Sequence, residues 1–282
     1  MVHRVFLCIG VVFLLLGFSS RSLLGSEKSD LQEKFADVLL VVNYNHPFYQ
    51  SIPFLRQIYG GIFPNIIFYG ESASSEVNQV YTHFGYEHAR VVAHALKKYP
   101  GYSGYIFLQD DCFMNFWNYM RLDKTKIWLC VNQRSQFNRA TLGDGYQTPS
   151  WCWWDSAWGL VQLRRIMPFL SSEELQMLNS NHGDQIVVGQ VVDMFYVPGR
   201  LALHVSKLSE IFSNVFCELA IPTLLSCVDN IENWECLHAH WAGFCDQALR
   251  DYNPQLDWIH PLKFSSIKYK EFALQMIQEQ CP

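Results

Sequence analysis

The sequence predicts an α/β fold in which a mostly parallel β-sheet lies between two layers of helices. Three short runs of mainly apolar residues, Val38–Val42, Asn65–Tyr69 and Tyr105–Leu108, have the length of strands, and polar or glycine-containing loops follow the first two. Segments with helical periodicity separate these runs. Strands and helices that alternate with short connections form parallel, right-handed βαβ units.

The first half of the chain supplies the elements of this sheet in order. Val38–Val42 is wholly aliphatic, as in a central parallel strand, and the polar loop Asn43–Pro47 follows it. Apolar residues recur at helical spacing over residues 52–59 and again over 86–99, so we expect a helix in each range. Tyr105–Leu108 is then a strand that is buried on both faces.

The second half is predicted with fewer signals. Ile127–Val131 has the composition of a strand, whereas Asn132–Thr148 has no periodicity and is expected to be a loop. A capping box, with Ser171 as the N-cap and Glu174 three residues later, opens a helix. The apolar run Ile186–Val192 follows it, and we expect one long amphipathic helix over 208–219, ahead of Pro222.

The N-terminal segment has the pattern of a targeting sequence. Val5–Phe18 is almost uninterruptedly apolar, but it is shorter than the about 20 residues of a membrane-spanning helix. We interpret residues 1–20 as an uncleaved signal anchor, 21–35 as a stem and 36–282 as the folded domain. The chain is then a single-pass type II membrane protein that faces the Golgi or ER lumen; with a cleaved signal peptide it is secreted.

Composition narrows the classes of partner. Charged residues make up 17% of the chain and the net charge is -5, which excludes the basic stripe of a nucleic-acid-binding protein. Eight of the nine cysteines lie outside the targeting segment, so we expect some disulfide bonds in an oxidising compartment. Their pairing stays open, and the cysteine and histidine spacings match no structural zinc site.

Two adjacent carboxylates mark the candidate site. Asp110 and Asp111 follow directly on the strand Tyr105–Leu108 and its neighbour Gln109. Ligands of open α/β sheets bind beyond the carboxyl ends of the strands. Acidic side chains among apolar residues need a metal ion or hydrogen-bond donors to offset the cost of burial. A cation-dependent ligand site is expected here; the alternative is two solvated acids at a strand end.

The step Gln109-Asp110-Asp111, at the end of an apolar strand, resembles the Asp-x-Asp-type motif of GT-A nucleotide-sugar glycosyltransferases. Together with Asn115–Asn118, Asp37–Tyr49 and Phe63–Gly70, it resembles the lumenal part of STELLO-like proteins, a Golgi family with a glycosyltransferase-like fold. The resemblance implies a GT-A-like (Rossmann-like) three-layer sandwich with a mostly parallel central sheet. It also implies that Asp111 binds Mn²⁺ or another divalent cation on the diphosphate of a nucleotide-sugar donor. Asp110 then lies near the ribose or the waters of the metal.

The same resemblance extends to residues that are distant in the sequence. Asn43, Asn45 and His46 are candidates to hold the nucleotide, unless they are ordinary turn residues. His260 is the candidate third metal ligand and Lys263 the candidate diphosphate partner, because imidazole suits Mn²⁺ and an ammonium group suits phosphate. The rival late imidazoles are those of His238 and His240, and the alternative for His260 and Lys263 is a solvated loop.

An inverting transfer needs a carboxylate that takes the proton of the acceptor hydroxyl. Asp184 is the preferred candidate and Asp155 its competitor; the alternative for both is helix capping or solvation. Four indoles could stack on an acceptor sugar or pack in the core. These are the side chains of Trp151, Trp153, Trp154 and Trp158.

Three functions follow from these patterns. The first is a metal-dependent glycosyltransferase that moves a sugar from a nucleotide-diphosphate donor to a glycan, protein or lipid acceptor in the secretory pathway. The second is a non-catalytic protein of the same fold that associates with other Golgi enzymes and organises them. The third is a secreted, disulfide-bonded protein that recognises glycans through its tryptophans.

Overall fold

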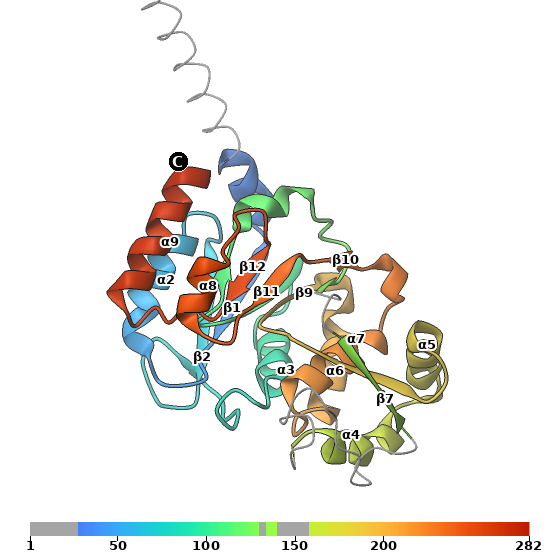
Figure 1. The fold of residues 1–282 in the computed structure, drawn as a ribbon. Coiled ribbons are helices and arrows are strands. Elements are labelled where there is room, and N and C mark those ends of the chain that lie inside the picture. The colour runs from blue at the N-terminus through green and yellow to red at the C-terminus, as the bar shows by residue number, and fades with distance from the viewer. Residues whose placement is uncertain (1–27, 130–133, 140–157, 282) are drawn as a thin grey trace, which may run out of the picture.

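The central feature of the molecule is a β-sheet with helices on both faces (Figure 1). The computed structural model describes residues 28–129, 134–139 and 158–281. Within these residues seven strands pair in the order β10-β6-β9-β4-β1-β2-β3. They are β1 (Val38–Asn43), β2 (Asn65–Gly70), β3 (Asn78–Gln79), β4 (Gly104–Gln109), β6 (Trp128–Leu129), β9 (Met194–Pro198) and β10 (Glu235–Cys236). All of these pairings are parallel except those of β9, which runs antiparallel to β4 and β6.

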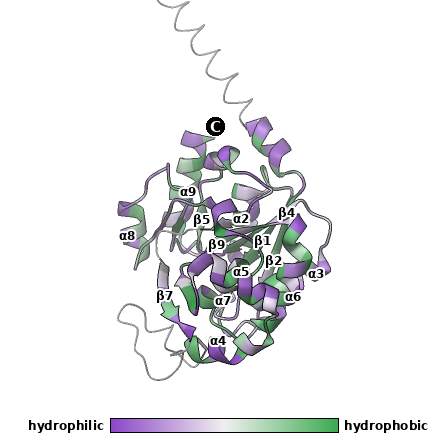
Figure 2. Cartoon of the chain, turned by 90° about the vertical axis from the view of Figure 1, so that its right-hand side faces the viewer, coloured by the Kyte–Doolittle hydropathy of each residue, from purple (hydrophilic) through white to green (hydrophobic). Residues whose placement is uncertain are grey.

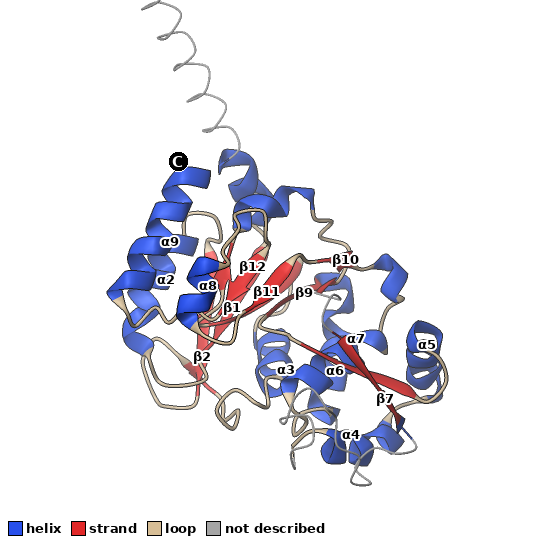
Figure 3. Cartoon of the chain, viewed as in Figure 1, coloured by secondary structure: helices blue, strands red, loops and turns tan. Residues whose placement is uncertain are grey.

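The two faces of the sheet are covered by different helices (Figure 3). One face packs against α2 (Ile52–Tyr59) and α9 (Ile267–Gln280), and the other against α3 (Ala89–Lys98), α6 (Ala202–Ile211) and α7 (Cys217–Ser226). Alternate residues of β1 and β4 enter the two cores, because successive side chains of a strand point to opposite faces. Figure 2 shows these apolar strands in the interior. The predicted three-layer α/β sandwich with a mostly parallel sheet is confirmed.

The other strands of the described residues form two smaller sheets. One has the order β11-β12-β5, formed by β11 (Ala239–Trp241), β12 (Trp258–His260) and β5 (Phe113–Met114). The other pairs β7 (Arg134–Asn138) with β8 (Ile186–Gln190). The loop predicted over Asn132–Thr148 is therefore wrong for residues 134–138. Phe137 pairs with Val187 and is buried, so a partner about 50 residues away creates a strand that has no periodicity of its own.

The predicted long helix over 208–219 is also wrong. It is interrupted between α6 and α7, and Pro222 lies inside α7 instead of after its end. Distant carbonyl groups satisfy the backbone at the break: the N–H of Phe216 donates to Trp158 O and the N–H of Cys217 donates to Tyr86 O, both at 2.7 Å. Tertiary hydrogen bonds thus replace the continuous helical ladder that periodicity predicts.

The remaining helices of the described residues are α4 (Leu160–Ile166), α5 (Ser172–His182) and α8 (Cys245–Arg250), with short 3₁₀ turns between elements. The predicted capping box at the start of α5 is present, since Ser171 Oγ accepts from Glu174 N and Glu174 accepts from Ser171 N. Residues 28–35 are also helical, and Leu31 and Phe35 are buried in the core. The folded part therefore includes the second half of the predicted stem.

The predicted disulfide bonds and signal anchor involve residues that the structure describes only in part. No two of the six described cysteines are joined by a disulfide bond, and Cys130 and Cys152 lie outside the described residues. The predicted disulfides thus have no support in the described part of the chain. None of the helices in that part is long and apolar enough to span a membrane. The predicted signal anchor lies outside it.

Candidate functional site

Four polar residues gather at one edge of the central sheet. The parallel strands β1 and β4 end there, and the Asp110 N–H donates to Asn43 O at 2.9 Å. Because β9 runs the opposite way, its amino end reaches the same edge, and Gln109 N–H donates to Asp193 O at 2.9 Å. Asn43, Asp110, Asp111 and Asp193 therefore share the edge where ligands of α/β sheets bind.

The small sheet brings a distant segment to Asp111. β12 pairs antiparallel with β5, Ile259 opposite Phe113, and Leu262 N–H donates to Asp111 O at 2.6 Å. His260 Nε2 then lies 3.1 Å from Asp111 Oδ1, and Lys263 Nζ contacts Asp111 Oδ2. The structure thus unites Asp111 with a late imidazole and a late ammonium group across 149 and 152 positions of sequence.

The two neighbouring aspartates have opposite electrostatic environments. Burial alone would raise the pKa of Asp111, but the charges and hydrogen bonds of His260 and Lys263 hold that pKa well below its usual range. Burial raises the pKa of Asp110 well above its usual value, and the negative charge of Asp111 adds to the rise. The surroundings of Asp111 thus favour its ionised form, whereas those of Asp110 disfavour ionisation.

Asp193 is a site residue that the sequence reasoning missed. Its Oδ1 lies 3.6 Å from His260 Nδ1, so the imidazole lies between two carboxylates. Burial lowers the pKa of His260, yet the charges of Asp193 and Asp111 outweigh it and raise this pKa to about 9. The available signal was a single acid between Val192 and Met194, in an otherwise apolar stretch. An acid in such a stretch needs a partner.

The cluster offers some ligands for a divalent cation but not a complete site. Asp111 Oδ1 and His260 Nε2 are hydrogen-bonded to each other at 3.1 Å. Both are atom types that bind divalent ions once the imidazole has released its proton. Two buried acceptors of the same edge, Asn43 Oδ1 and Asp193 Oδ2, have no hydrogen-bond partner among the described residues. No three His, Cys, Asp or Glu side chains in that part of the chain form a ready metal cage. A cation would need ligand oxygens besides Asp111 and His260.

The predicted nucleotide-binding residues divide into two groups. Asn43 is fully buried, and its Nδ2 lies 3.5 Å from both Asn45 Oδ1 and Gln109 Oε1. Asn45 packs against Gly85, where an added Cβ would overlap Asn45 Oδ1. His46 instead is exposed, with its ring 6.0 Å from that of Phe84. Asn43 and Asn45 belong to the sheet edge, and His46 belongs to the adjoining surface.

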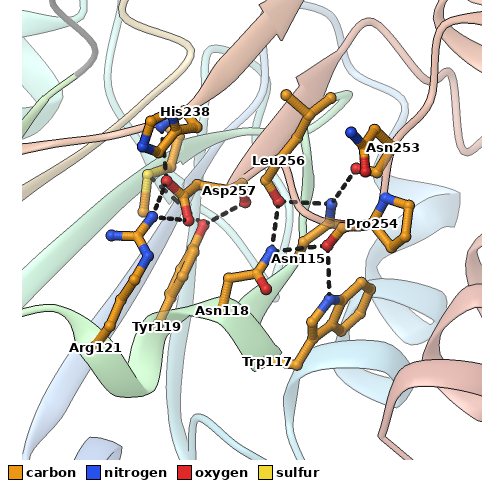
Figure 4. Close-up of polar contacts among 11 residues, drawn as sticks. Asn115, Trp117, Asn118, Tyr119, Arg121, His238, Asn253, Pro254, Leu256 and Asp257 are labelled. Carbon is orange, nitrogen blue, oxygen red and sulfur yellow. Dashed lines mark hydrogen bonds and ion pairs between the residues drawn. The ribbon is translucent and has the colours of Figure 1, made fainter.

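A polar network fixes the segment that carries His260 (Figure 4). Asp257 is fully buried, and both of its carboxylate oxygens accept hydrogen bonds from the guanidinium of Arg121. Its Oδ2 also accepts from His238 N at 2.7 Å, and its carbonyl accepts from Tyr119 Oη at 2.9 Å. The start of β12 is therefore tied to the segment after β5.

Amide side chains extend this network along the residues before β12 (Figure 4). Asn115 Nδ2 and Asn118 Nδ2 each donate to Leu256 O at 2.8 Å. Asn118 Nδ2 also donates to Pro254 O at 2.8 Å, and Trp117 Nε1 donates to the same oxygen at 3.0 Å. Because a shift of one residue would invert the side chains of β12, these bonds help to keep His260 directed at Asp111.

The rival imidazoles occupy other positions. His238 gives its backbone N–H to Asp257, and His240 Nε2 lies 3.3 Å from Asp251 Oδ2, near the end of α8. Among the described contacts, neither His238 nor His240 reaches Asp111. His260 is the late histidine at this site.

The predicted catalytic acid that the structure describes, Asp184, is not part of this cluster. Asp184 is exposed and lines a groove beside α5 together with Ser172, Leu175 and Asn179. It precedes the strand β8, so it is not a helix N-cap. Asp155 lies outside the described residues, as do Trp151, Trp153 and Trp154. The described member of the indole group, Trp158, stacks near His83 with ring centroids 4.7 Å apart.

The chain is thus an α/β protein with a candidate ligand site that combines carboxylates, an imidazole and an ammonium group. No family model matches the sequence. The chain is similar to the probable glycosyltransferases STELLO1 (22% identity over 251 residues) and STELLO2 (21% over 248 residues) of Arabidopsis thaliana. Each alignment covers 83% of this chain and 31% of the relative. The chain thus spans about a third of the length of these relatives.

A solved structure also shows similarity. It is a glycosyltransferase involved in the glycosylation of the major capsid of PBCV-1, with a TM-score of 0.39 and 10% sequence identity. The match covers 83% of this chain and 98% of that chain, although a TM-score of this size does not establish a common fold. The sequence similarity to STELLO1 and STELLO2, both named probable glycosyltransferases, agrees with the predicted resemblance.

Proposed function

We propose that this chain is a metal-dependent glycosyltransferase of the secretory pathway that takes a nucleotide-diphosphate sugar as donor. The observation that carries the proposal is the convergence of His260 and Lys263 on Asp111 at the carboxyl edge of the sheet. The acceptor is a glycan, a protein or a lipid. The similarity to the two probable glycosyltransferases supports the class of reaction.

Each residue of the cluster has a role that its environment suits. Asp111 would hold Mn²⁺ or another divalent cation together with His260, whose imidazole must release its proton to bind the ion. The cation would neutralise charge on the leaving diphosphate. Asp193 lies beside the other imidazole nitrogen, where a carboxylate orients a metal-binding histidine. The Lys263 ammonium can move from Asp111 to diphosphate oxygens.

Asp110 and Asn43 suit the sugar of the nucleotide. The Asp110 carboxyl can hydrogen-bond to a ribose hydroxyl, because it accepts in either protonation state and also donates when it is protonated. Asn43 Oδ1 is a buried acceptor without a partner among the described residues, so a ligand hydroxyl would satisfy it. None of the described carboxylates in the cluster is assigned as the base that takes the proton of the acceptor. Asp184 therefore remains the proposed base, and a separate experiment must test it.

We place the domain in the Golgi or ER lumen, anchored through residues 1–20 as a type II membrane protein. The apolar segment Val5–Phe18 supports this location. Intact-mass measurement of the protein purified from cells tests it, because the mass of a chain with an uncleaved anchor includes residues 5–18. A mature chain that starts after residue 20 would show that the protein is secreted.

Calorimetric titration with UDP- and GDP-sugars tests the donor site. We expect binding that needs Mn²⁺ in the unaltered chain and is lost in Asp111→Asn. Asp184→Asn is the matched control, because this exposed acid lies outside the cluster and should leave donor binding unchanged. If no donor binds under any metal, the enzymatic function is wrong.

One observation favours a second candidate, the non-catalytic protein that associates with other Golgi enzymes. Both carboxylate oxygens of Asp111 are already engaged by cationic side chains, which compensate its charge without a metal. A site that is neutralised in this way can be stable as a remnant of catalysis. The same titration decides between the two functions, since a non-catalytic remnant predicts no metal-dependent donor binding.

A further inference from the structure

Next to the candidate site lies a surface row of five aromatic rings, here called the aromatic strip. Its rings follow one another with centroid distances of 5.9, 6.0, 5.8 and 6.1 Å. In this order they belong to Phe48, His46, Phe84, His83 and Tyr81. The strip thus joins the loop after β1 to the loop after β3.

Much of the strip is open to solvent. The exposed fractions are 40% for Phe48, 53% for Phe84 and 58% for Tyr81. Large aromatic rings gain free energy when they leave water, so a row of exposed rings on one surface points to a binding partner. The rings also carry polar groups: Tyr81 Oη and His83 Nδ1 are 3.0 Å apart.

The backbone that displays these rings is held in an unfavourable conformation. His83, Phe84 and Gly85 have φ values of 52°, 59° and 84°, in the left-handed region that costs about 1–2 kcal/mol for each residue with a Cβ. Glu71 Oε1 stabilises the loop by accepting hydrogen bonds from Thr82 N, Thr82 Oγ1 and Phe84 N at 2.9, 3.0 and 2.7 Å. Strain that specific bonds maintain is characteristic of functional loops.

The strip is continuous with the proposed donor site. Gly85 packs against Asn45, and Asn45 Oδ1 lies 3.5 Å from Nδ2 of Asn43, the last residue of β1. On its other side, His83 stacks near Trp158, the described member of the predicted indole group. A ligand on the strip would therefore lie beside the edge where the donor is proposed to bind.

We propose that the aromatic strip binds a glycan, and that this glycan is the acceptor of the transfer; the second part rests on the proposed function. Neighbouring rings of the strip meet at angles of 43° to 79°, so they present both faces and edges. An aromatic face can stack on the C–H face of a sugar ring, and the Tyr81 hydroxyl and the imidazoles can hydrogen-bond to sugar hydroxyls. One nucleobase covers about one ring, whereas five rings in a row match a ligand of several rings. An oligosaccharide is such a ligand.

A microarray of neutral oligosaccharides, probed with the full chain, tests the proposal without any donor. We expect binding to a subset of glycans that weakens about tenfold or more in the double variant Tyr81→Ala, Phe84→Ala. Phe169→Ala is the matched control, because this ring is 71% exposed outside the strip and its loss should change nothing. Titration of the double variant with UDP-sugar and Mn²⁺ should give the affinity of the unaltered chain.

Three results would contradict a glycan site on the strip. The unaltered chain could bind no glycan, the double variant could bind glycans as well as the unaltered chain does, or the double variant could lose affinity for the nucleotide sugar instead of for the glycan. The last result would make the strip a nucleobase site. Glycan binding that depends on the strip, in a chain that binds no donor, would support the glycan site and overturn the proposed transfer.

Discussion

Replacing Asp257 by Asn should destabilise the protein, although the two side chains have nearly the same shape. The carboxylate of Asp257 is fully buried and accepts from the Arg121 guanidinium and from His238 N–H. The Arg121 guanidinium bonds both carboxylate oxygens, and His238 N–H bonds one of them. An amide has one acceptor oxygen, so at least one of these hydrogen bonds is lost and the new NH₂ group faces a donor.

The size of this effect follows from the exposure of the partners. Loss of a hydrogen bond to a charged group costs roughly 1.5–3 kcal/mol. The ion pair adds less than about 1 kcal/mol, because the Arg121 side chain is 44% exposed and water screens it. We expect the free energy of unfolding to fall by about 3 kcal/mol, which corresponds to roughly 6–12 °C in Tm.

Urea unfolding followed by far-UV circular dichroism measures this change. Asp251→Asn is the control, because that carboxylate is 41% exposed and 3.3 Å from His240, and its loss should cost less than about 0.5 kcal/mol. A decrease below about 0.5 kcal/mol in Asp257→Asn would refute the view that this network holds the segment before β12.

Two further predictions concern a buried histidine and a glycine. Burial lowers the pKa of His88 to about 4, and both ring nitrogens lack partners among the described residues. The unfolded chain therefore takes up a proton near pH 6.5 that the folded chain refuses until about pH 4. The contribution of His88 to stability should be constant above pH 6.5 and fall by about 3 kcal/mol between pH 6.5 and 4. Other titrating groups, such as His260 with its raised pKa, add their own pH dependence, so the test compares two chains. Urea titrations from pH 6.5 to 4 should show a weaker dependence in His88→Leu than in the unaltered chain, and an unchanged one would contradict the assignment. Gly85→Ala should lower stability by more than about 1 kcal/mol, since its φ is 84° and the new Cβ would overlap Asn45; Gly61→Ala, with no atom within 4 Å of the added Cβ, is the control in the same thermal melts.

Local chemistry determined the elements that the sequence predicted correctly. A run such as Val38–Val42 has no polar side chain to place in water, so it must be a strand buried on both faces. The capping box of α5 is equally local, because Ser171 and Glu174 satisfy each other within one turn. Asp110 and Asp111 had to lie at a ligand-facing edge once β4 was recognised.

Contacts between distant segments decided the rest. Asp193 joins the site because β9 runs antiparallel to β4, and β7 exists because β8 pairs with it. The break between α6 and α7 depends on carbonyls of Trp158 and Tyr86. His260 was a candidate from the sequence, but only the pairing of β12 with β5 brought it to Asp111. Residue type and local spacing thus determined which groups can bind a ligand, whereas strand direction and register, which depend on long-range hydrogen bonds, decided which of them meet.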